Sequence, residues 1–164
     1  MSIRATVKMF CTVVETLAAS VPFISNTRNS VTHDGLNEEK TLTATSTPTG
    51  TTLAQGDVDM TAGAATLDLR ACEGTQGAVD LNGLKPRVII IEAKAGNANP
   101  ITIAKGASNG YTGFGAAFSI TLQPGQKVMI DDNGAGTAVS GTVKTLDVSG
   151  TGTQGLNYMI VGGG

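Results

Sequence analysis

Turn-forming residues recur at intervals of about ten along most of this chain, and only short segments remain between them. From residue 40 onward, runs rich in Thr, Val, Ile and Leu are separated by Pro-Thr-Gly, Gln-Gly-Asp, Pro-Gly-Gln and Asp-Asp-Asn-Gly. Branched residues fit a pleated strand, whereas Gly, Pro, Asn and Asp favour turns. No segment keeps a helical period. The sequence therefore predicts an all-β chain of about nine or ten short strands.

The composition is compatible with one domain that has a real core. A chain of 164 residues can bury most of its apolar surface in a single domain. Hydrophobic residues make up 40% of it and aromatic residues 4%, without Trp, so the core must consist of Val, Ile, Leu, Ala and Met. The strand spacing predicts a single antiparallel β-sandwich or jelly-roll-like domain.

The strongest predicted strand covers residues 87–95, where four branched apolar residues follow one another. Continuous apolar character indicates a central strand that is buried on both faces. The Gly-Asn-Ala-Asn-Pro segment after it predicts a hairpin with residues 101–104. A second hairpin is expected within residues 118–131, where Pro124 and Gly125 suit the centre of a type II turn.

The N-terminal segment alternates between apolar and polar residues, which predicts a long strand. Phe10 and Val14 interrupt its polar side, so both faces are expected to contact protein near its end. Such a strand either joins the sheet or reaches a neighbouring subunit. The odd, apolar positions are Ile3, Ala5, Val7, Met9, Cys11 and Val13, and we expect Ile3, Val7, Met9 and Phe10 to make intersubunit contacts.

Residues 18–39 contain Pro22, several Asn and an Asp-Gly pair without a sustained period, which is typical of a linker. We therefore divide the chain into an N-terminal strand, or arm, with its linker at residues 1–39 and a β-sandwich domain at residues 40–164.

Charge and hydropathy argue against nucleic-acid and membrane partners. The net charge is -2, and the scattered Lys and Arg residues form neither a basic patch nor an aromatic platform. No apolar run reaches the length of about 20 residues that a membrane helix needs. Arg4 and Lys8 before an apolar run resemble a secretory signal, but Glu15 interrupts that run. Cys11 and Cys72 are expected to be buried thiols made in a reducing cytoplasm, with one disulfide as the alternative.

Residues 150–155, Gly-Thr-Gly-Thr-Gln-Gly, match the dinucleotide-binding pattern G-x-G-x-x-G. That pattern requires a helix after its third glycine, within a βαβ unit. The residues that follow here are strand-like. A similar Thr-Leu-Asp and Gly-Thr-Gln-Gly combination occurs at 66–77, so we interpret both copies as strand and turn, in a repeated hairpin, and predict no cofactor.

The sequence predicts no catalytic or metal-binding residues. His33, the single histidine, lies in a turn-like segment, and no serine has the G-x-S-x-G context of a hydrolase. Asp57 with Asp59 and Asp131 with Asp132 are the close carboxylate pairs, and neither has EF-hand spacing. A weak Ca²⁺ site at Asp131 and Asp132 and a purely structural role in the turn remain alternatives.

Tyr111 and Phe114 lie in a glycine-rich loop of a chain that is poor in aromatics. Exposed, they would anchor a partner or a glycan. Folded inward, they would close one end of the sandwich. The residues alone do not separate these alternatives.

Three segments, AGNANPITIAKGASNGYTGF, FSITLQPGQKVMIDD and KTLDVSGTGTQGLNYMIVGG, resemble small β-rich virion proteins of tailed bacteriophages, most of all auxiliary head proteins, called decoration or cement proteins. The resemblance covers residues 60–164. It implies a non-enzymatic sandwich protein that stabilises the head lattice, bound to the major capsid protein or other virion subunits. It also implies a homo-oligomer, often a trimer, made in the host cytoplasm and found in the virion. No residue roles carry over.

Three other functions stay open at this point. A tail tube or fibre subunit would be another structural role, and a tube subunit is expected to stack in rings through a long inter-ring loop. A carbohydrate-binding sandwich would use Tyr111 and Phe114 to stack on sugars. A hydrolase with His33 as its base is the least supported alternative.

Overall fold

The computed structural model describes residues 3–16, 30–33, 37–133 and 135–164. These residues form strands and contain no helix, and the strands pair in antiparallel fashion, which confirms the all-β prediction. The twelve described strands are β1 (Arg4–Met9), β2 (Val13–Thr16), β3 (Ser30–His33), β4 (Glu38–Thr43), β5 (Thr52–Asp59), β6 (Ala64–Asp68), β7 (Lys85–Ala93), β8 (Ile101–Lys105), β9 (Ser119–Leu122), β10 (Lys127–Asp131), β11 (Thr145–Gly150) and β12 (Gly155–Gly163).

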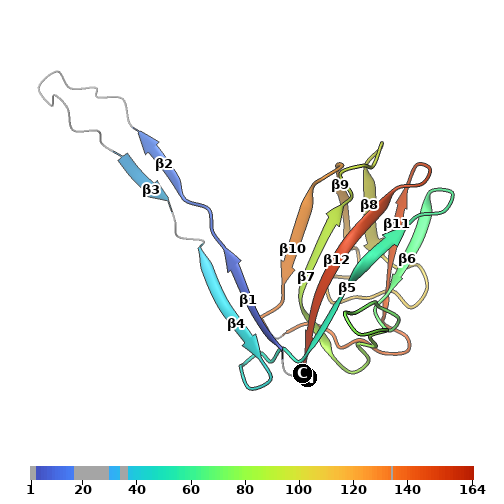
Figure 1. Cartoon of the computed structure of the whole chain (residues 1–164), viewed down its shortest axis with the longest axis horizontal. Coiled ribbons are helices and arrows are strands. Elements are labelled where there is room, and N and C mark those ends of the chain that lie inside the picture. Colours follow the sequence, from blue (N-terminus) through green and yellow to red (C-terminus); the bar gives the residue numbers. More distant parts are fainter. Residues whose placement is uncertain (1–2, 17–29, 34–36, 134) are drawn as a thin grey trace, which may run out of the picture.

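Two four-stranded sheets make up the body of the protein (Figure 1). Their strand orders are β10-β7-β12-β5 and β6-β11-β8-β9. From β5 to β12, each strand and the next lie in opposite sheets, except β8 and β9, which pair directly. The chain therefore crosses repeatedly between the two sheets.

One hydrophobic core joins the two sheets. On β7, Ile89, Ile91 and Ala93 point into this core, and Ile101 and Ile103 of β8 enter it from the other sheet. Alternate residues of a strand face opposite sides, so the period-two pattern brings these side chains together. β7 lies between β10 and β12, as predicted for a central strand. On its opposite face Val88 is buried but Ile90 and Glu92 are half-buried, so the predicted burial of both faces holds only in part.

The predicted hairpin of residues 87–95 with residues 101–104 is wrong, because β7 and β8 belong to different sheets. The turn between them exists, but it carries the chain across the core. Asn97 holds this crossing: its side-chain amide donates to the Gly155 carbonyl at 2.8 Å, and its Oδ1 accepts from the Gly155 amide at 2.8 Å. The path of the chain after β7 is thus fixed by β12, which is distant in the sequence.

The second predicted hairpin, within residues 118–131, is wrong for the same reason. The turn itself forms as expected: the Gln126 amide donates to the Gln123 carbonyl at 2.9 Å, and Gly125 has φ of 78°, which suits the third position of a type II turn. However, β9 before the turn pairs with β8, whereas β10 after it pairs with β7.

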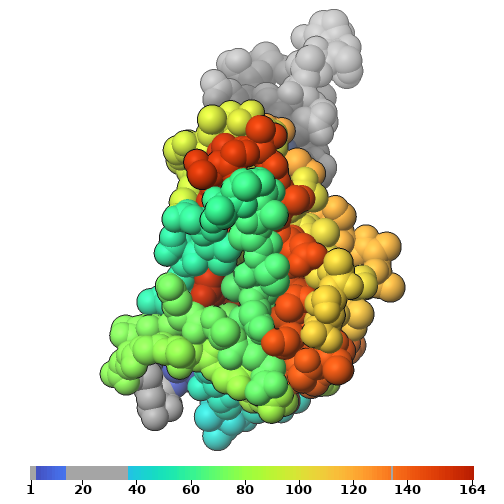
Figure 2. All heavy atoms as spheres, turned by 90° about the vertical axis from the view of Figure 1, so that its right-hand side faces the viewer, coloured from blue at the N-terminus to red at the C-terminus, as the bar shows by residue number. Residues whose placement is uncertain are grey.

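The two Thr-Leu-Asp copies lie side by side, because β6 and β11 pair with Leu67 opposite Leu146. The sequence repeat is therefore a pair of adjacent strands and not a repeated hairpin, since β11 and β12 lie in different sheets. Figure 2 shows the side of the body remote from β2 and β3, where teal and green residues of β5 and β6 lie against the orange and red C-terminal strands.

β1 pairs with β4 and β2 pairs with β3, in two two-stranded sheets that follow one another. We call these four strands the N-terminal ribbon, and Figure 1 shows that it leaves the body and projects from it. The predicted single strand is divided, with residues 10–12 between β1 and β2. His33 lies in β3 opposite Val13, so its predicted place in a turn is wrong. The proposed boundary between residues 39 and 40 falls inside β4.

Candidate interaction surface

The N-terminal ribbon is attached to the body through a small apolar cluster. Ala5 and Val7 of β1 are half-buried, whereas the alternating residues of the same strand are exposed. The cluster is centred on buried Leu42 of β4 and on Val88 and Val161 of the body. Ile3 also packs against this cluster. Part of the surface that the sequence assigned to a neighbouring subunit, at Ile3 and Val7, is thus used within the chain.

An ion pair reinforces this attachment. Lys40 of β4 contacts Asp131 of the edge strand β10 through its Nζ atom, and both side chains are 15% exposed. The neighbouring Asp132 accepts a hydrogen bond from Arg87 Nη1 at 3.1 Å and another from the Gly136 amide at 2.9 Å. Asp131 and Asp132 therefore fix the ribbon and a turn. The described residues contain no group of three His, Cys, Asp or Glu placed to hold a metal ion.

The apolar side chains of the ribbon become exposed where it leaves the body. Met9 is 38% exposed, Phe10 62% and Val13 51%. Leaving out residues 14–16 and 30–33, whose side chains are not described, the other exposed large hydrophobic side chain is Met159 of β12, at 42%. Gathered apolar side chains at a surface indicate an interaction site. Two of the predicted contact residues, Met9 and Phe10, are therefore free of the body.

Met159 lies in an apolar groove between β1 and the outer face of the β10-β7-β12-β5 sheet. The strand register places Met129, Ile90 and Met159 in one row across β10, β7 and β12. The groove encloses about 400 Å³. A second hollow of about 180 Å³ shares Ile90 and Met159 and extends the groove along the sheet. The residues that line the main groove are Ala5, Thr6, Val7, Lys8, Val88, Ile90, Met129, Met159 and Val161.

An ion pair lines the second hollow: Lys127 contacts Glu92 at 3.3 Å. Elsewhere, Lys94 donates to Asp57 and Asp59 at 2.6 Å each, and these bonds raise the pKa of Lys94. The predicted Asp57 and Asp59 pair therefore meets a lysine. An apolar centre with a polar rim is the usual anatomy of a protein–protein interface.

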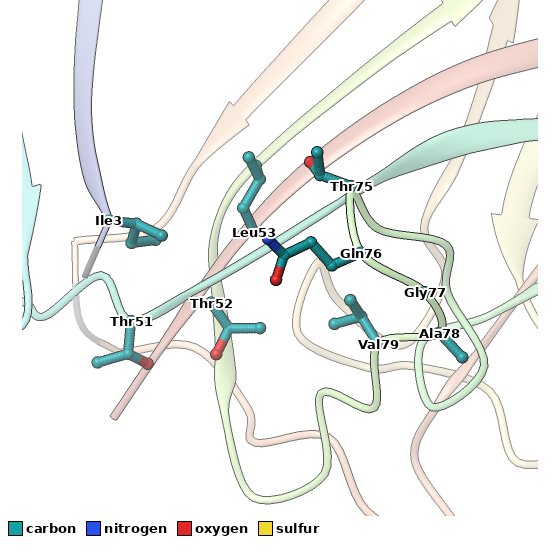
Figure 3. Close-up of a pocket in the computed structure, with 9 residues that line it drawn as sticks. All are labelled: Ile3, Thr51, Thr52, Leu53, Thr75, Gln76, Gly77, Ala78 and Val79. Carbon is teal, nitrogen blue, oxygen red and sulfur yellow. The ribbon is translucent and has the colours of Figure 1, made fainter. Parts of the chain in front are cut away.

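A different hollow, of about 260 Å³, lies at the base of the ribbon and contains the first Gly-Thr-Gln-Gly copy (Figure 3). Gln76 points from this loop toward the first residues of β5, and Ile3 lies on the far side (Figure 3). Neutral side chains line it: Ile3, Thr51, Thr52, Leu53, Thr75, Gln76, Gly77, Ala78 and Val79. No charged group among them would bind a phosphate.

The second Gly-Thr-Gln-Gly copy stabilises the loop between β7 and β8 through Gln154. Gln154 is 6% exposed, its Oε1 accepts from the Ala98 amide at 2.8 Å, and its Nε2 donates to the Thr151 carbonyl at 2.8 Å. Strand β12 begins at Gly155, so the helix that a dinucleotide site needs does not follow the motif, as the sequence predicts.

Tyr111 is not an exposed anchor, contrary to one of the two sequence interpretations. It is 1% exposed, and its hydroxyl donates to the Thr137 carbonyl at 2.9 Å. Its ring packs edge-on against half-buried Phe114, with the ring centroids 5.1 Å apart, and the centroids of Phe114 and Phe118 are also 5.1 Å apart. Burial raises the pKa of Tyr111. The satisfied hydroxyl makes this burial favourable, and Phe114 and Phe118 pack against the same core.

The two cysteines are free thiols in different surroundings. Cys72 is buried, and burial raises its pKa to about 12. Cys11 is exposed on the ribbon, so the expectation of two buried thiols is right for Cys72 and wrong for Cys11. The groove residues Ile90, Met129 and Met159 were not predicted. The one indication in the sequence was that each is an apolar residue at a position of its strand that faces away from the core.

Comparison of the chain with protein-family models, with curated proteins and with solved structures gives no match. None of the described residues belongs to a helix able to span a membrane. The geometry defines an all-β protein with a projecting apolar ribbon and an apolar groove beside the root of that ribbon.

Proposed function

We propose that this protein is a structural, non-enzymatic subunit of a bacteriophage virion, which binds the head lattice as a decoration or cement protein. One observation carries the proposal: a ribbon rooted in a rigid all-β body exposes Met9, Phe10 and Val13 away from that body. A subunit that reinforces a shell needs a stiff body and a contact that reaches a neighbour. The resemblance of residues 60–164 to auxiliary head proteins supplies the location.

In this proposal the two sheets form a β-sandwich of jelly-roll-like connectivity, and the N-terminal ribbon is an arm. The repeated crossing of successive strands between the sheets supports the jelly-roll-like description. The arm interpretation is supported by the way the apolar cluster at Leu42 fixes only the root of the ribbon. The body then binds the major capsid protein, and the arm links neighbouring subunits into an oligomer.

Binding to head shells tests the proposal. Shells assembled from the major capsid protein without this chain are mixed with the purified protein and sedimented. Saturable binding at a fixed ratio, with an ordered layer in cryo-electron microscopy, is the expected result. Phe10→Glu should weaken occupancy about tenfold or more, as for loss of an apolar anchor. Ser149→Glu, at an exposed residue near the end of β11, is the matched control. Failure of the wild-type protein to bind shells would reject the head role.

The projecting ribbon also favours a second candidate, a tail tube subunit, because such subunits are expected to contact the next ring through a long loop. Electron microscopy of the purified protein alone separates the two candidates. Stacked rings or tubes of constant diameter support the tail role, whereas particles that order only on shells support the head role. A carbohydrate-binding role loses its main anchor, because the ring of Tyr111 is buried.

A further inference from the structure

We propose that the groove on the outer face of the β10-β7-β12-β5 sheet receives the N-terminal ribbon of a second copy of this chain. In this contact, Phe10 and Val13 of one molecule pack on Ile90, Met129 and Met159 of the other. The inference rests on the proposed function only in taking the ribbon as a contact between subunits. It adds the identity of the partner and the surface that receives the ribbon.

Among the residues whose side chains the structure describes, the exposed large hydrophobic ones occur in two places. Three of them, Met9, Phe10 and Val13, lie along the ribbon, and the fourth, Met159, lies in the groove. The row formed with Ile90 and Met129 makes the groove an apolar strip across three strands. Contact between the ribbon and the strip covers both surfaces at once, and it removes apolar area from water on each side.

The same molecule cannot supply this contact while its ribbon stays attached as observed. Val7 and Leu42 hold the root of the ribbon on the body, and Lys40 pairs with Asp131 beside them. Beyond that root the ribbon diverges from the sheet, and β2 lies away from the body (Figure 1). Val13 begins β2, Phe10 lies between β1 and β2, and neither residue lines the groove of its own molecule. The side chains that fill the groove must then come from another molecule.

The charges around both surfaces favour a second copy over a strongly charged partner. The groove has Lys127 paired with Glu92 on its rim. The ribbon carries an exposed pair of its own, Lys8 with Glu39 at 3.1 Å. Each of these two pairs combines one cation with one anion, so neither pair offers a net charge to an anionic or cationic partner. Two such pairs can instead meet with opposite charges facing each other.

The contact joins two different surfaces of the chain. It can be made twice in a closed two-fold dimer, where each ribbon enters the groove of the other molecule, or once per pair in a head-to-tail ring or open chain. In every case, a native ribbon on one molecule and a native groove on another are enough for one contact. Two variants that each remove one of these surfaces should therefore complement each other.

Phe10→Glu removes the inserted side chain, and Met159→Glu places a charge in the receiving strip. Both positions are exposed, so the monomer should keep its fold, which circular dichroism and thermal unfolding check. Analytical ultracentrifugation of the purified wild-type protein should show oligomers at micromolar concentration. Each variant should raise the dissociation constant about tenfold or more, because burial of an unpaired carboxylate is unfavourable. Ser149→Glu, on the exposed end of β11, should leave it unchanged.

Mixing the two variants provides the decisive measurement. The Met159→Glu protein retains a native ribbon and the Phe10→Glu protein retains a native groove, so an equimolar mixture should form 1:1 heterodimers with near wild-type affinity. A monomeric wild-type protein, an oligomer insensitive to Met159→Glu, or a mixture that stays monomeric would each overturn the proposal. A monomer that still binds head shells would overturn it while the proposed function stands.

Discussion

The body and the N-terminal ribbon use the same alternating sequence pattern, with opposite outcomes for their apolar side chains. In the body, Ile101 and Ile103 of β8 are fully buried, because a second sheet covers the first. In the ribbon no second sheet is present among the described strands, and the alternating apolar residues Met9 and Val13 are 38% and 51% exposed. A period-two pattern thus predicts a two-faced strand, but the burial of each face depends on what the chain places over it.

The comparison also separates two sources of stability. A two-stranded ribbon is marginally stable alone, whereas a sheet with a covered apolar face is stable by itself. The ribbon depends on its root at Leu42 and, in our proposal, on a second molecule. The body depends on its own core. Substitutions in the body should therefore change the free energy of unfolding, whereas substitutions in the ribbon should change local opening and association.

The largest expected effect is in the body. Ile91→Ala should lower the free energy of unfolding by about 2–5 kcal/mol, because it leaves a cavity between the sheets. Phe10→Ala should change that free energy by less than about 0.5 kcal/mol, as for an exposed site. Urea denaturation of the isolated protein measures both. Equal effects at the two positions would mean that the ribbon is part of the cooperative core.

The next effect concerns the ion pair at the root. Asp131→Asn leaves the Lys40 ammonium poorly solvated and without its carboxylate, and we expect a loss of about 1–3 kcal/mol, less than for a fully buried pair. Replacing both residues, with Lys40→Met and Asp131→Leu, should restore much of the loss. Thermal unfolding gives the comparison. A double variant less stable than Asp131→Asn would show that the ion pair contributes net stability beyond the cancellation of two buried charges.

The sequence predicted local conformation better than it predicted neighbours. The turn at Pro124 and Gly125 and the central position of β7 were correct, because each depends on residues close together in the chain. Both hairpins were wrong, because turn residues fix backbone angles without deciding which sheet the next strand joins. A predicted turn at Gly56 lies instead within β5. A Cβ there would lie 2.9 Å from Tyr158 Oη, so this glycine permits close packing.

The candidate surface was predictable on one side only. Met9 and Phe10 stood out because apolar residues continued where the alternation failed. The groove could not be predicted, because Met129, Ile90 and Met159 form a row only through the registers of β10, β7 and β12. Tyr111 was ambiguous for a similar reason: its partner, the Thr137 carbonyl, is 26 residues away.

A smaller, local effect should follow Leu42→Ala. This change removes apolar contacts between the ribbon and the body. The protection of the β1 and β4 amides from hydrogen exchange should therefore fall about tenfold, which corresponds to roughly 1.4 kcal/mol of opening free energy. Amides of β7 and β8 should keep their protection. Val13→Ala, further along the ribbon and 51% exposed, serves as the control and should leave exchange in β1 unchanged. Uniform loss of protection across both regions would contradict a separate ribbon.

The smallest effect on stability, and the sharpest difference between the regions, concerns the two thiols. At pH 8, a maleimide should modify exposed Cys11 promptly and buried Cys72 only when the body unfolds. The pKa of Cys72 is raised from 9.0 to about 12, so the folded state retains a proton that the unfolded state releases. The contribution of this thiol to stability is complete below pH 9 and declines as the pH rises from 9 toward 12. Cys72→Ala should flatten that decline, whereas Cys11→Ala should not. Because a thiol reagent reports local opening, equal labelling rates at the two positions would mean that the core opens as readily as the ribbon.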